Sequence, residues 1–106
     1  MFRKIKSKIS PFSYQWNILV NIDNKISTSF SEFKEIIPPK DRFWADPFVI
    51  YKNQQHHVFF EEFLDFKNKG HLSVMIVDNN GNYSKPVKIL ERDYHLSYPS
   101  IFEFEN

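Results

Sequence analysis

Asp46 is the residue whose type and position could best support catalysis, because this carboxylate directly precedes Pro47 at a predicted loop–strand junction. A carboxylate there could act as a general base or a nucleophile on a sugar if a second carboxyl lay about 5–9.5 Å away. Glu61 and Glu62 are adjacent in a predicted strand, so they face opposite sides and cannot both join Asp46. The plainer alternative is that Asp46 is a turn residue whose carboxylate accepts backbone N–H groups.

The two glutamates lie among phenylalanines, so one of them must face the packed side of its strand. A buried carboxylate without a partner is costly. Arg42 is a candidate partner, and an ion pair that supports the fold is the expected role for this glutamate.

Three aromatic or imidazole residues are candidates for contact with a sugar. Trp44 lies two residues before Asp46, and aromatic faces either stack on the C–H surfaces of sugars or fill the junctions between packed elements. His95 and Tyr98 lie around a second, similar loop before Pro99. They either contact a sugar at the rim of a pocket or belong to a surface loop.

No metal or cofactor site is predicted. His56 and His57 are adjacent in a predicted strand, so their side chains point apart. The chain has no cysteine, and its two isolated glycines cannot form a glycine-rich phosphate loop.

Two X-Pro loops, each followed by a β-branched and aromatic run, organise the elements that must position these residues. Proline lacks an N–H to donate and therefore fits the first residue of a strand. Pro47 and Pro99 are 99 − 47 = 52 residues apart, and four strand-like runs lie between them. Those runs are 47–52, 56–64, 71–78 and 83–90, the last with Pro86 inside it, as an edge strand tolerates.

This spacing predicts an all-β fold: an antiparallel four-stranded blade plus the start of a second, as a fragment of a β-propeller. A simple four-stranded meander would explain the turns equally well but not the repeated X-Pro entrance. Turns are expected at Asn53-Gln54, over 65–70, and at Asn80-Gly81, where the Asn-Gly pair favours a two-residue type I′ turn.

The rest of the chain is less regular. Residues 13–22 form a candidate strand, and the spacing of Phe30, Phe33, Ile36 and Ile37 suggests one or two helical turns. Residues 1–12 are expected to be a basic, loose tail that could touch an anionic membrane surface. Residues 13–106 are then the propeller part.

Bulk composition excludes several classes of function. Lys and Arg number 14 against 13 Asp and Glu, so no basic excess favours nucleic acid as a partner. Aromatic residues make up 18% of the chain, well above the level of a disordered protein. No run approaches the ~18 apolar residues of a membrane span, and no secretory signal is recognisable, so a cytoplasmic protein, possibly at the membrane surface, is expected.

An ordered set of short motifs resembles a known family. The motifs are Trp16-Asn17-Ile18, Phe43 to Phe48 (Phe-Trp-Ala-Asp-Pro-Phe), Val58 to Phe63 (Val-Phe-Phe-Glu-Glu-Phe), Gly70 to Ser73 (Gly-His-Leu-Ser) and Leu96 to Pro99 (Leu-Ser-Tyr-Pro). Together they look like the N-terminal five-bladed propeller domain of the glucosamine inositolphosphorylceramide transferase type. The resemblance covers roughly residues 13–106.

The resemblance implies a place in glycoconjugate or surface-polysaccharide synthesis. The transferase chemistry of that family is assigned to a separate C-terminal domain, so this chain would recognise a glycan rather than act on it. The partners implied are a sugar-containing substrate and the remaining blades of a longer parent protein.

Two alternatives stay open. The Asp-Pro entrance is more distantly similar to five-bladed glycoside hydrolases of the arabinanase and levansucrase group, where it would make Asp46 the general base or nucleophile. A truncated chain with no activity of its own is the other alternative.

Overall fold

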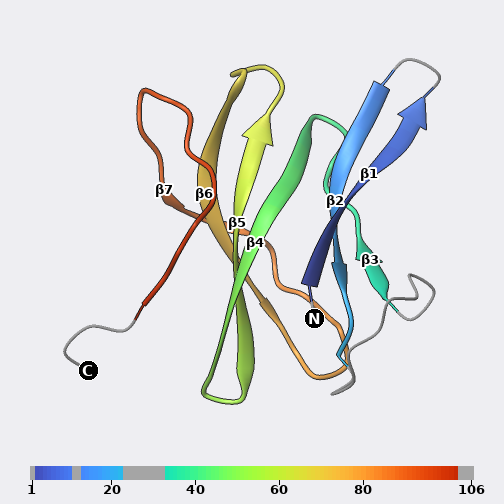
Figure 1. Cartoon of the computed structure of the whole chain (residues 1–106), viewed down its shortest axis with the longest axis vertical. Helices are drawn as coiled ribbons and strands as arrows, with labels where there is room; N and C mark the ends of the chain where they lie inside the picture. The colour runs from blue at the N-terminus through green and yellow to red at the C-terminus, as the bar shows by residue number, and fades with distance from the viewer. Residues whose placement is uncertain (1, 11–12, 23–32, 103–106) are drawn as a thin grey trace.

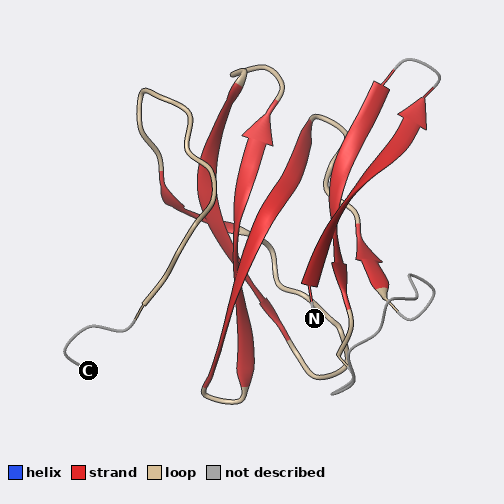
Figure 2. Ribbon diagram, in the orientation of Figure 1, coloured by secondary structure: helices blue, strands red, loops and turns tan. Residues whose placement is uncertain are grey.

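Two antiparallel β-sheets make up the part of the chain that the computed structural model describes, which is residues 2–10, 13–22 and 33–102. The first sheet has the order β1-β2-β3 and the second β4-β5-β6-β7, each strand pairing with the next along the chain (Figure 1). The strands are β1 (Phe2–Ser10), β2 (Ser13–Val20), β3 (Lys34–Ile36), β4 (Arg42–Lys52), β5 (Gln55–Leu64), β6 (Lys69–Val77) and β7 (Val87–Leu90). Within these ranges there is no helix (Figure 2), so the predicted all-β antiparallel class is confirmed.

The two sheets share one hydrophobic core. Strands β1 and β2 lie beside β4 (Figure 1). Apolar side chains of both sheets belong to the same buried cluster. The core residues are Ile18, Val20 and Ile36 from the first sheet and Trp44, Val58, Phe60, Met75 and Val77 from the second. Alternation along each strand therefore gives the second sheet an inner face toward the first sheet and an outer face away from it.

The turns of the second sheet were only partly predicted. Asn53 and Gln54 form the two-residue β4–β5 turn, and both have positive φ (54° and 63°), as a type I′ turn requires. The loop between β6 and β7 is different. Gly81 has φ +81°, but Asn80 has no positive φ, so a two-residue turn at Asn80-Gly81 is wrong.

Asp78 explains the shape of that loop. Its backbone carbonyl accepts the N–H of Gly81, and its carboxylate accepts the N–H groups of Asn80 and Asn82. A side chain that binds its own backbone in this way offers an alternative to the tight hairpin. The result is a three-residue loop closed by left-handed Gly81, after which β7 starts only at Val87 rather than at Tyr83.

Three further expectations are corrected. Residues 2–10 are the edge strand β1 and not a loose tail. Residues 34–36 pair with β2 as a strand instead of forming a helical turn, while Phe30 lies outside the described residues. Strand β4 begins at Arg42, before Pro47, because a bulge between Ala45 and Phe48 removes the need for an N–H at the proline.

We predict that Gly81→Ala lowers the free energy of unfolding by about 1 kcal/mol, because alanine resists positive φ. The nearest atom to the added methyl group would be Lys34 Cδ at 3.4 Å, an ordinary contact, so the cost is one of backbone conformation. Urea denaturation of this variant beside Asn80→Ala measures it. Asn80→Ala should cost much less, and equal losses at the two positions would contradict the three-residue loop.

Candidate functional site

A buried carboxylate, that of Glu62, organises the inner face of the second sheet. Glu62 is only 6% exposed and lies on β5 between Trp44 of β4 and His71 of β6. Its Oε2 accepts the indole N–H of Trp44 at 2.8 Å and a guanidinium N–H of Arg42 at 3.2 Å. Its Oε1 accepts the hydroxyl of Ser73 at 3.0 Å and faces His71 Nε2, also at 3.0 Å.

These contacts decide the ionisation of Glu62. Burial alone would raise the pKa of this carboxyl, but the hydrogen bonds from Trp44, His71, Arg42 and Ser73 together lower it below its ordinary value. Glu62 is therefore ionised, and His71 Nε2 carries the proton that it donates. A carboxylate offers about four acceptor positions, and all four are occupied here.

A cavity of about 460 Å³ opens beside this cluster. Its walls come from the β3–β4 connection, from β4 and β5, and from the segment between β6 and β7. The lining residues are Ile37, Pro38, Pro39, Arg42, Trp44, Glu62, Tyr83, Lys85 and Pro86. Aromatic rings and prolines with a few polar groups are the lining expected of a small-molecule site.

The amide of Gln15 fixes one wall of this cavity. Its Nε2 lies 3.2 Å from the carbonyl oxygen of Pro38 and 2.7 Å from those of Pro39 and Arg42. This contact ties β2 of the first sheet to the start of β4. The cavity is therefore positioned jointly by both sheets.

His95 belongs to the opposite face of the second sheet. Its Nδ1 accepts the backbone N–H of Gly70 at 2.8 Å, so the ring proton is on Nε2, which lies 3.2 Å from Glu61 Oε1. The ring also packs edge-on against Phe63. Leu96 N donates to the carbonyl of Gly70, which completes the attachment of this crossing segment to the sheet.

The structure thus separates two of the predicted sugar-contacting residues. Trp44 is bound to Glu62 on the inner face, whereas His95 is bound to Glu61 on the outer face. Their separation follows from the alternation of Glu61 and Glu62 along β5. Asp46 lies half-buried at the β4 bulge, and Tyr98 is 76% exposed.

Asp46 and Tyr98 do share one unusual property. Each precedes a proline, which should favour extended backbone, yet both have φ 52°. The extended conformation expected for them is therefore wrong. Left-handed residues other than glycine are uncommon. Of the five in the part of the chain that the structure describes, only Asp46 and Tyr98 precede a proline, and they lie 98 − 46 = 52 residues apart.

Sequence reasoning found Arg42 as a partner for a buried glutamate, and the 3.2 Å contact with Glu62 confirms it. It missed His71 and Ser73. The pairing of β5 with β6 is the signal that could have found them. His71 pairs with Glu62, and Ser73 is the next residue of β6 on the same face, so both side chains point toward this carboxylate.

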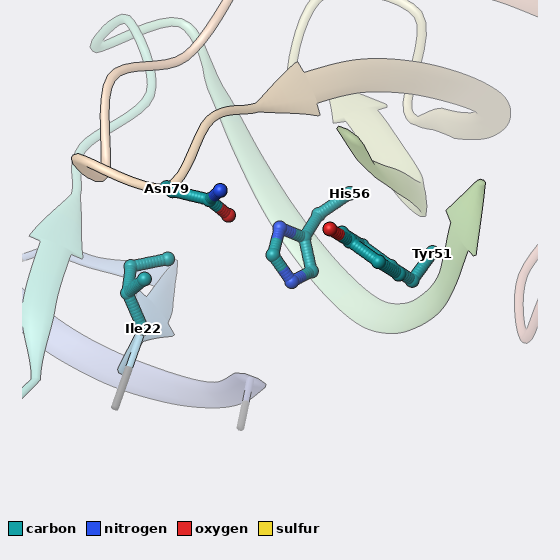
Figure 3. A pocket seen from close by; sticks show the side chains of 4 residues that line it. All are labelled: Ile22, Tyr51, His56 and Asn79. Atoms are coloured by element: carbon teal, nitrogen blue, oxygen red, sulfur yellow. The ribbon is translucent and has the colours of Figure 1, made fainter. Parts of the chain in front are cut away.

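A second hollow lies at the other end of β4 (Figure 3). It is lined by Ile22, Tyr51, His56 and Asn79, with the Tyr51 and His56 rings 4.7 Å apart. No group of three His, Cys, Asp or Glu in the described ranges could hold a metal ion. Among the same residues, no helix is long and apolar enough to cross a membrane.

These residues form an antiparallel, two-sheet β-domain with a carboxylate-centred cavity at the junction of its sheets. Residues 13–106 match the family model described as glucosamine inositolphosphorylceramide transferase 1, N-terminal, and the chain belongs to this family. It is therefore related to the N-terminal domain of a glycosyltransferase-related protein. Searches of curated proteins and of solved structures found no match.

We predict that Glu62→Gln lowers the free energy of unfolding at pH 7 by about 2–4 kcal/mol, because the amide nitrogen cannot accept hydrogen bonds and two buried donors lose their acceptor. The loss should depend on pH. Since the folded-state pKa of Glu62 is depressed, its contribution is complete above the ordinary value of 4.5 and disappears as the pH falls through the lower folded value.

Urea denaturation of the wild-type protein and of Glu62→Gln between pH 7 and pH 2 measures this loss. The difference between their free energies of unfolding at each pH removes the contribution of groups that titrate in both proteins. Glu91→Gln is the control, because the pKa of this partly exposed carboxyl is also lowered, to about 2, chiefly by hydrogen bonds from Lys88 and Lys67. Its contact with the cluster is a longer one, 3.9 Å from Oε2 to His71 Nδ1. This substitution should cost much less at pH 7. A Glu62→Gln deficit that stays constant down to pH 2 would contradict the assignment.

We predict that Gly70→Ala displaces the crossing segment 95–96. An added methyl carbon would lie 2.7 Å from the carbonyl oxygen of Leu96 and 2.8 Å from His95 Cε1, closer than side-chain carbons approach such atoms. Amide hydrogen exchange at Leu96 should become faster in the variant while exchange at Phe60 changes little. Unchanged protection of Leu96 would mean that this segment does not depend on Gly70.

Proposed function

We propose that this chain is the N-terminal part of a β-propeller that recognises a glycan during glycosyl transfer. Two parts of the proposal have separate support, namely the repeat architecture and the nature of the cavity. The family to which the chain belongs is named for a transferase that acts on a glycosylated lipid. This family name supports the carbohydrate assignment.

The equal backbone conformations of Asp46 and Tyr98 support the propeller. A repeated fold reuses the same local geometry at each repeat. Two pre-proline residues 52 positions apart that both adopt φ 52° are what two successive blade entrances would show. Pro99, which follows Tyr98, is buried although its neighbours on both sides are exposed.

The outer face of the second sheet also fits a stack of blades. Phe43 and Phe63 stack on it with ring centroids 4.7 Å apart, and both remain partly exposed. Phe59, Leu72 and Val74 are partly exposed on the same face. A neighbouring blade would bury this apolar surface, as adjacent repeats do.

The single observation that carries glycan recognition is the rigid aromatic and proline lining of the cavity. Trp44 is only 3% exposed and its indole N–H is bound to Glu62, so its ring is a fixed support at the cavity wall. Tyr83 adds a second, partly exposed ring, and Pro38 and Pro39 add a rigid apolar wall. Flat apolar surfaces of this kind pack against the C–H faces of a sugar.

The hydrogen bonds of Glu61 and Glu62 favour glycan recognition over hydrolysis. A glycosidase that used Asp46 would need a second free carboxyl nearby. Glu62 is ionised and fully bonded, and Glu61 is held by His95 on the other face. Neither glutamate is suited to give a proton to a leaving group.

We predict that Tyr83→Ala weakens binding of the chain to a glycan selected from an array by about tenfold or more, because the removed ring is one wall of the cavity. Isothermal titration measures the affinity. Tyr51→Ala is the matched control, since it removes an exposed ring from the separate hollow of Figure 3. Loss of binding with Tyr51→Ala but not with Tyr83→Ala would place the site elsewhere, and no binding to any array glycan would contradict the proposal.

A further inference from the structure

The charged side chains that line the Trp44 cavity are two cations, Arg42 and Lys85, and one carboxylate, Glu62. Glu62 has no acceptor position left, because Trp44, Arg42, Ser73 and His71 fill all four. The carbonyl oxygens of Pro38, Pro39 and Arg42 are engaged by the Gln15 amide.

Arg42 keeps part of its donor capacity. A guanidinium has five N–H bonds, and three are used, two on Asp41 and one on Glu62. Two N–H bonds (5 − 3 = 2) therefore remain at the cavity wall. Glu62, the carboxylate among the described residues that line the cavity, is bound to this same guanidinium.

Lys85 supplies a further cation. It lines the cavity and is exposed, and no hydrogen bond or ion pair of its ammonium group occurs within residues 33–102. No described residue therefore compensates its three N–H donors or its charge. A ligand that fills the cavity must bring acceptors and negative charge to meet them.

We propose that the cavity binds an acidic sugar, with the carboxylate or phosphate group of the sugar against Lys85 and Arg42 and its ring against the exposed ring of Tyr83. This inference rests on the proposed function, since it names the class of glycan that the same cavity takes. Arg42 would bind through its two free N–H groups without giving up Glu62. The site would therefore recognise the acid while the buried cluster stays intact.

Titration calorimetry of the full chain at low salt tests this with glucose, glucuronate, glucose 1-phosphate and inorganic phosphate as probes. At least one of the two acidic sugars should bind at least about fivefold more tightly than glucose. Comparison of glucuronate with glucose 1-phosphate shows whether the site prefers a carboxylate or a phosphate. Lys85→Gln should remove that preference. Lys52→Gln, at the far end of β4, should leave it unchanged.

Three outcomes would overturn the inference: glucose binding as tightly as both acidic sugars, a preference that survives Lys85→Gln, or inorganic phosphate binding as tightly as glucose 1-phosphate. The first leaves the proposed glycan site standing, because neutral sugar still binds and Tyr83→Ala still weakens it. Absence of binding to every sugar overturns the inference and the proposed function together.

Discussion

The ionised carboxylate of Glu62 is the interaction on which the inner face of the second sheet depends. It joins three strands, because its donors come from β4 and β6 while it lies on β5. Taking such a charge out of water is costly, and the cost is offset only when every acceptor position finds a donor. Four donors of four different residue types meet that condition here.

The same carboxylate explains why the cavity has its chemical character. By accepting the indole N–H of Trp44, Glu62 fixes this buried ring at the cavity wall. Since its own acceptors are filled, Glu62 gives the cavity no acceptor of its own. The other charged side chains that line the cavity are Arg42 and Lys85, and this excess of cations is the basis of the proposed acidic ligand.

Strand alternation then separates this site from the contact between Glu61 and His95. Glu61 and Glu62 are neighbours in sequence, but the first holds His95 on the outer face and the second holds Trp44 on the inner face. The outer contact fixes the path of the chain after β7, through Gly70 and Leu96. One dipeptide therefore positions both the candidate site and the crossing segment at His95 and Leu96.

The strands of the second sheet were predictable because their apolar and turn residues act locally. The turn at Asn53-Gln54 and the partnership of Arg42 with a buried glutamate followed from the same reasoning. The loop at Gly81 did not, because the carboxylate of Asp78 outcompetes the Asn-Gly preference. Strand β3 escaped prediction because its three residues are fixed by pairing with β2 and not by their own periodicity.

The site was the least predictable feature. Trp44 was found from its type alone, but His71 and Ser73 become part of the site only through the register of β5 and β6. The positive φ of Asp46 and Tyr98 runs against the local preference of a residue before proline. At Asp46 this backbone conformation belongs to the bulge between Ala45 and Phe48, which a local pattern does not show.

The most direct test of the account is the pH titration of the Trp44 indole N–H resonance by NMR, assigned by comparison with Trp44→Phe. A hydrogen bond to an ionised, buried carboxylate predicts a downfield indole proton that shifts only when the pH falls below the ordinary pKa of 4.5 for a glutamate. In Glu62→Gln the resonance should lose this titration. An indole proton that has an unperturbed shift, or that is independent of pH down to unfolding and unaffected by Glu62→Gln, would contradict the central role of Glu62.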